Sequence, residues 1–227
     1  MKRIRSVVGR ALFVASGAFV LAALAPSSAS ACGGEWYPIF QVDPRIKGVD
    51  NAEDALDEGK TLAAAGSVVR MIPHIRKLDV TRVKIVQRAG RVLALATARY
   101  DGALPVGREV PWYAQGTWLG RTEAARRANL DWAARTLRAI AQARRDDPAA
   151  RTELAEALAR VDTTRDEARS ILEELAGKDL ITSPNGYATL ASLRELAGDD
   201  AGRRAALDRC KAMSPKAPAC GDTTRST

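Results

Sequence analysis

Few side chains in this sequence could perform acid–base or nucleophilic chemistry. His74 is the only histidine, so a Ser-His-Asp triad would depend on it, and no nucleophile-elbow motif accompanies it. Acidic pairs at 146–147, 173–174 and 199–200 could act together across a cleft, but they fall at expected helix ends and solvent-facing positions. The chain has no CxxC motif, which argues against zinc. We therefore expect no enzymatic activity, no metal and no cofactor.

Three cysteines are the next reactive candidates. Cys210 and Cys220 are ten residues apart near the end of the chain, and a disulfide between them would hold the tail. In that case Cys32 is left over, for acylation or for an intermolecular bridge. The alternative is that Cys32 pairs with one of the other two and joins both ends of the chain. The sequence leaves both pairings open.

One segment, from Ala103 to Arg121, carries the candidate binding residues. It is rich in glycine and proline, which disfavour helix, and it also holds Trp112, Tyr113 and Trp118. These three aromatic side chains are candidates for contact with a protein or peptide partner. The competing hypothesis is that they fold back and pack against the helices.

The elements that would position this segment are amphipathic helices. In the amino-terminal half we expect helices over residues 51–58, 60–78, 81–100 and 122–145. Pro73 should either kink or shorten the second of these helices. Asp147-Pro148 and Ser183-Pro184 are typical of a helix N-cap followed by proline at the first helical position. A capping box is expected at 164–167, a stop at Gly177, and a new cap at Asp199 after Gly198. Residues 147–215 therefore read as two successive helix–turn–helix units.

These two units resemble a divergent tetratricopeptide-repeat (TPR-like) family of the secreted bacterial type. Prolines 148, 184 and 215 are separated by 36 and 31 residues, on either side of the family period of about 34. Leu93, Ala96 and Tyr100 repeat the opening pattern in the first half. The remaining residues that carry the resemblance are Leu154, Ala157-Leu158, Val161, Ala168, Leu172, Tyr187, Leu190-Ala191 and Leu207. The resemblance implies an all-α, right-handed superhelical array of repeats that presents a binding surface; a generic helical bundle is the alternative.

The amino-terminus has the features of a secretory signal peptide. Lys2, Arg3, Arg5 and Arg10 precede an apolar run over 11–24, and Ala29-Ser30-Ala31 forms a small-residue cleavage site. Cleavage would leave Cys32 first, so acylation as a lipoprotein is the alternative to simple export. Residues 32–227 hold 31 basic and 27 acidic residues, a mild net charge of +4 that does not favour nucleic acid. Basic pairs at 126–127, 144–145 and 203–204 are expected to be solvated, or to meet acidic tails or anionic polymers of the envelope.

These features predict four parts. They are a signal peptide (1–31), an extended segment (32–48), a TPR-like helical domain (49–215, with the loop insertion 103–121) and a disordered tail (216–227). We expect an exported, non-catalytic scaffold, periplasmic or secreted, that binds a protein or peptide in the cell envelope. The alternative is an outer-membrane lipoprotein with a structural role, acylated at Cys32, which would touch the membrane only through its lipid.

Overall fold

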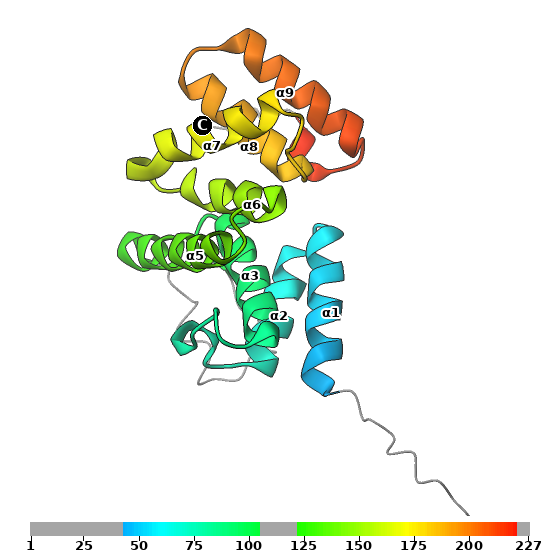
Figure 1. The fold of residues 1–227 in the computed structure, drawn as a ribbon, viewed down its shortest axis with the longest axis vertical. Helices are drawn as coiled ribbons and strands as arrows, with labels where there is room; N and C mark the ends of the chain where they lie inside the picture. Colours follow the sequence, from blue (N-terminus) through cyan, green and yellow to red (C-terminus); the bar gives the residue numbers. More distant parts are fainter. Residues whose placement is uncertain (1–42, 105–121, 222–227) are drawn as a thin grey trace, which may run out of the picture. The chain divides into compact units, whose positions relative to one another are not determined.

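The computed structural model describes residues 43–104 and 122–221 (Figure 1). Within these two ranges the chain forms eight α-helices and three short 3₁₀ turns and contains no β-strand. The prediction of an all-α fold is therefore confirmed at this level.

The first half of the described chain contains α1 (Pro44–Asp57), α2 (Thr61–Met71), the 3₁₀ turn η1 (Ile75–Lys77) and α3 (Lys84–Arg99). Helix α1 begins seven residues before the expected start at 51, because Asp43 caps it. The Asp43 carboxylate accepts a hydrogen bond from the Arg45 backbone N–H at 2.9 Å, and Pro44 occupies the first helical position. Residues 44–48 are thus helical rather than extended. Pro73 shortens the helix expected over 60–78, which was one of the two effects predicted for it: α2 ends before Pro73, and η1 follows separately.

The second half contains α5 (Glu123–Ala143), α6 (Pro148–Leu158), η2 (Asp162–Thr164) and α7 (Arg165–Gly177). It continues with α8 (Pro184–Leu196), α9 (Asp200–Met213) and η3 (Pro218–Cys220). Three expected caps are present: Asp147, Ser183 and Asp199 each accept a backbone N–H at the start of α6, α8 and α9, at 2.8–2.9 Å. The sequence therefore located these helix starts correctly.

The capping box expected at the start of α7 is wrong, whereas the helix stops at Gly177 as expected. Thr164 makes no capping bond to the helix, because its hydroxyl donates to the Leu158 carbonyl at 2.7 Å instead. Gly177 is the last helical residue, and the left-handed conformation falls at Asp179, with φ of 55°. The tail expected to be disordered from 216 is also ordered in its described part, where η3 contacts α8 and α9.

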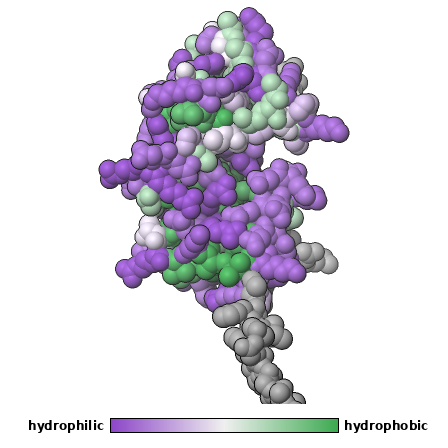
Figure 2. Space-filling model, turned by 45° about the vertical axis from the view of Figure 1, so that its right-hand side comes forward, coloured by the Kyte–Doolittle hydropathy of each residue, from purple (hydrophilic) through white to green (hydrophobic). Residues whose placement is uncertain are grey.

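Each described helix packs on the one that follows it along the chain. In addition α1 contacts α3, α3 contacts α6, and α6 contacts α8 (Figure 1). Helices α3 and α6 therefore have neighbours on both sides. Helix α6 is almost wholly enclosed, with residues 152–158 all buried. Buried leucines and alanines make up most of one hydrophobic core that extends through the described domain. Its fully buried side chains include Leu93, Leu137, Leu158, Leu172 and Leu190. Hydrophilic side chains cover most of the face in Figure 2, with smaller apolar patches between them.

Candidate functional site

Helix α3 holds three arginines that tie it to its neighbours. Arg88 donates from Nε to Glu53 on α1 at 3.2 Å, and Arg91 donates from Nε to both carboxylate oxygens of Glu153 on α6 at 2.8 Å. Arg99 donates from Nε to Glu156, also on α6, at 3.0 Å. These pairs follow the same sequence of helices, α1 to α3 to α6, as the packing contacts.

The two glutamates of α6 are buried, which is unusual for charged side chains. Glu153 is 6% exposed and Glu156 is 3% exposed. Burial raises the pKa of Glu153, and the hydrogen bonds from Arg91 oppose that rise without cancelling it. Because each carboxylate faces an arginine, these residues connect helices and do not form a carboxylate pair open to a substrate. The sequence pattern missed them, since charges within an apolar stripe were read as solvent-facing.

A shallow cavity of about 280 Å³ lies between α7, α8 and α9. Arg194 donates from Nε to Glu173 at 2.8 Å on one side of it, and Tyr187 donates its hydroxyl to Asp179 at 3.1 Å. The guanidinium of Arg209 lies over the Tyr187 ring, 5.9 Å from its centroid. The charged groups on this cavity are therefore already paired with one another, and they stabilise the contact between these helices.

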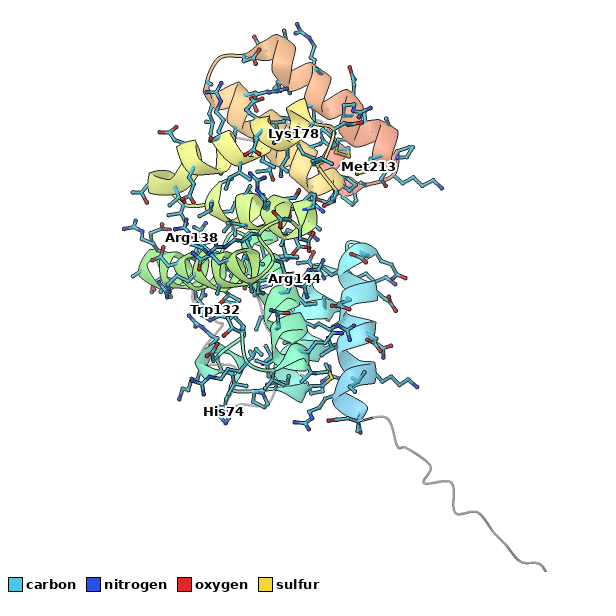
Figure 3. The ribbon with its side chains drawn as sticks, viewed as in Figure 1. His74, Trp132, Arg138, Arg144, Lys178 and Met213 are labelled. Carbon is cyan, nitrogen blue, oxygen red and sulfur yellow. A yellow bond between two sulfur atoms is a disulfide. The ribbon has the colours of Figure 1, made fainter. Side chains whose placement is uncertain are left out.

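Where η1 meets α5, an arginine side chain stacks on a tryptophan ring. The Arg76 guanidinium lies 5.6 Å from the centroid of the Trp132 ring, which is 8% exposed. Burial and the positive charge of Arg135 both lower the pKa of Arg76. Figure 3 labels Trp132 and Arg138 on α5, Arg144 at its C-cap and His74 on the turn that precedes η1; Arg138 pairs with Glu167 of α7 at 2.6 Å. This corner brings basic side chains from two separate segments together.

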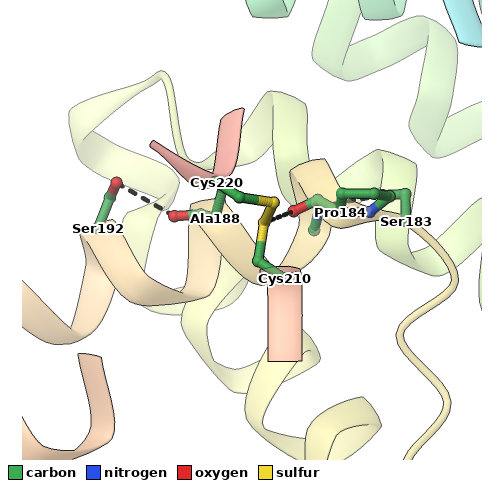
Figure 4. The surroundings of a disulfide bond; sticks show 7 residues. Ser183, Pro184, Ala188, Ser192, Cys210 and Cys220 are labelled. Carbon is green, nitrogen blue, oxygen red and sulfur yellow. Dashed lines mark hydrogen bonds between the residues drawn. A yellow bond between two sulfur atoms is a disulfide. The ribbon is translucent and has the colours of Figure 1, made fainter. Parts of the chain in front are cut away.

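The pairing of Cys210 with Cys220 is present in the structure and is confirmed (Figure 4). The two Cα atoms are 5.5 Å apart, and the residues are 0% and 2% exposed. The Cys210 sulfur lies 3.0 Å from the Pro184 carbonyl oxygen at the start of α8. A disulfide sulfur has no proton to donate, so this is a close sulfur–oxygen contact. The bridge holds η3 against the last two helices.

Four other predicted site residues cannot be placed in the described part of the chain. Trp112, Tyr113 and Trp118, and Cys32, lie outside the described residues. His74 is exposed on its turn, and members of the expected acidic pairs either cap helices or pair with arginines of neighbouring helices. Asp147 and Asp199 cap helices, and Glu173 and Glu174 pair with Arg194 and Arg151.

Two features are absent from residues 43–104 and 122–221. They contain no group of three or more histidine, cysteine or acidic side chains placed to hold a metal ion. None of their helices combines the length and the apolar character that a membrane crossing needs. In comparisons with known proteins, no family model, curated protein or solved structure matches this chain.

Proposed function

We propose that this chain is an exported, non-catalytic scaffold, a right-handed superhelical array of TPR-like repeats that binds a protein or peptide in the cell envelope. The observation that carries the proposal is the packing order: each helix contacts the next, and α1, α3, α6 and α8 also contact one another in series. Helix–turn–helix repeats that stack on their neighbours produce this order. Such repeats present a surface, and their insertions are often on the binding face.

The charge pattern is consistent with a scaffold. The buried glutamates of α6 are matched to arginines of α3, and the charges around the α7–α9 cavity are paired with each other. These ion pairs join neighbouring helices and so stabilise the array. The binding residues would then lie in the insertion, with Trp112, Tyr113 and Trp118 as our candidates.

A selection from a random peptide library against the purified protein tests this function. We expect enriched peptides to bind the wild type and to lose most of their affinity for a Trp112→Ala/Trp118→Ala variant whose melting temperature is unchanged. A lower melting temperature in that variant would show that the tryptophans pack in the fold instead. Failure to enrich any peptide would count against the scaffold itself.

The lipoprotein alternative is supported by the cysteine pairing. The chain has three cysteines, and the bridge between Cys210 and Cys220 uses two of them. Cys32 is therefore left for acylation, for a bridge to another molecule, or as a thiol. Intact mass of the protein recovered from the envelope distinguishes these outcomes, because cleavage before Cys32, added acyl chains and a mixed disulfide each change the mass differently.

A further inference from the structure

The cavity between α7, α8 and α9, the last three α-helices of the described chain, is lined in part by apolar and small side chains (Figure 1). This part of the lining consists of Ala176, Gly177, Tyr187, Leu190, Ala205 and Ala206. Tyr187, Leu190 and Ala206 are buried beneath the cavity, with exposed fractions of 4%, 1% and 2%. A Cβ added to Gly177 would meet nothing within 4 Å, so this side of the cavity is open space. Because protein interiors are close-packed, a gap bordered by alanine and glycine is room for a side chain from another molecule.

Two arginines from different helices form much of the remaining wall. Arg194 of α8 donates from Nε to Glu173 at 2.8 Å and from Nη1 to a backbone carbonyl of α9 at 2.9 Å. Arg209 of α9 pairs with Asp179, and its guanidinium lies over the Tyr187 ring. Both cations are therefore held at the cavity by carboxylates of this chain before any ligand arrives. A wall that is already ordered loses little conformational entropy on binding.

We propose that this cavity binds one aromatic side chain of the partner peptide. This inference rests on the proposed scaffold function and adds a contact outside residues 103–121. The cavity volume of about 280 Å³ lies just below the range of about 300 to 1,000 Å³ that is common for small-molecule sites, so it suits a single side chain. The apolar floor would bury the ring, and a guanidinium attracts the face of an aromatic ring within about 6 Å of its centroid.

The pairing of the wall charges favours a neutral aromatic side chain over a charged one. An acidic side chain would have to displace Glu173 or Asp179 from its arginine, and a basic side chain would be repelled by Arg194 and Arg209. A neutral ring can contact both arginines while they keep their carboxylates. An aliphatic side chain could also cover the floor, but it lacks the attraction between a cation and a ring face.

An NMR titration of the isotope-labelled protein with N-acetyltryptophanamide tests the site. The cavity-filling variant is Ala205→Leu, and the matched control is Ala212→Leu. Residue 212 lies two turns further along the same face of α9, is exposed as Ala205 is, and does not line the cavity. In the wild type and the control we expect saturable shifts of the Gly177 and Leu190 amides, with a dissociation constant on the order of a few millimolar. Ala205→Leu should bind at least about fivefold more weakly, because the leucine occupies the space.

A second measurement needs no variant. N-acetylleucinamide and the amide of N-acetylglutamate should each bind the wild type at least about threefold more weakly than N-acetyltryptophanamide does. Equal affinity for the leucine and tryptophan compounds would overturn the proposal. So would the absence of a saturable shift at these two amides in about 20 mM N-acetyltryptophanamide, or equal affinities of the wild type and Ala205→Leu.

Peptides selected from the random library separate this inference from the scaffold function. If they bind the wild type and Ala205→Leu equally well, the cavity is not a site for the partner and the scaffold function stands. If N-acetyltryptophanamide binds in the cavity but no peptide is enriched, the aromatic site stands and the scaffold function fails. Selected peptides that carry an aromatic residue and lose affinity for Ala205→Leu, but not for Ala212→Leu, would support both.

Discussion

The carboxylate of Glu156 on α6 accepts hydrogen bonds from two other helical elements at once. Arg99 of α3 donates from Nε to Oε2 at 3.0 Å, and Ser183, the N-cap of α8, donates its hydroxyl to Oε1 at 2.7 Å. The side chains of Glu156 and Arg99 are 3% and 16% exposed. One buried carboxylate therefore joins three helices that also contact one another in series along the chain.

Removing this carboxylate should destabilise the fold. Glu156→Met leaves Arg99 charged, largely buried and without its partner, which costs about 3–5 kcal/mol of unfolding free energy. Urea unfolding followed by circular dichroism measures the loss. Glu195→Met, which replaces an exposed glutamate of α8, should change the stability by no more than about 0.5 kcal/mol.

The double variant Arg99→Met/Glu156→Met separates the pair from its surroundings. Because the uncompensated charge is gone, it should be more stable than Glu156→Met alone. A double variant as unstable as the sum of the two single variants would show that the two side chains act independently.

The ion pair between α6 and α7 should make stability depend on pH. Hydrogen bonds from Arg151 and Lys178 lower the pKa of Glu174 from 4.5 to about 2. A carboxylate with a depressed pKa contributes stability above its unfolded value, and the contribution disappears as the pH falls through the folded value. Wild type should therefore exceed Glu174→Gln in stability at pH 6, and the difference should shrink towards zero near pH 2. Urea unfolding at pH 6, 4 and 2.5 measures it; a constant difference would contradict the assignment.

The disulfide should stabilise the end of the domain. Closing a loop of about ten residues limits the unfolded chain, an effect worth about 2–3 kcal/mol. Cys210→Ala/Cys220→Ala should lose that amount in chemical unfolding. Alanine is chosen because both sites are buried, where a serine hydroxyl would add its own cost. Dithiothreitol should lower the stability of the wild type only, and an equal effect on the variant would show that the reductant acts elsewhere.

Helix starts were the most predictable part of this fold. Asp147, Ser183 and Asp199 were recognised because a capping residue acts on backbone N–H groups two or three positions away, so the signal is local. The same logic applies to Asp43-Pro44, where the cap is present but was not recognised. Helix ends were less predictable, and Asp179 rather than Gly177 adopts the left-handed conformation after α7.

The charged contacts could not be read from the sequence in the same way. Glu153 and Arg91 are 62 positions apart, and Glu156 and Arg99 are 57 apart, so nothing local marks them as partners. Periodicity treats a charged residue as solvent-facing, whereas a helix with neighbours on both sides buries its whole circumference. The Cys210–Cys220 pairing was one of two that the sequence left open, and the structure shows which of them forms.

The turn after α3 offers a matched pair of glycine substitutions. Gly102 and Gly198 both have φ of +75°, a conformation that costs a residue with a side chain about 1–2 kcal/mol. A Cβ at Gly198 would meet nothing within 4 Å, but one at Gly102 would lie 2.5 Å from the Arg126 carbonyl oxygen on α5. Gly198→Ala should therefore lose only the conformational amount, and Gly102→Ala about 1–3 kcal/mol more, because α5 must move away. Urea midpoints of the two variants compare them directly. The Asn129 side chain on α5 donates a hydrogen bond to the Gly102 carbonyl at 2.9 Å, so α5 packs closely against this turn. Equal losses of stability in the two variants would contradict that close packing.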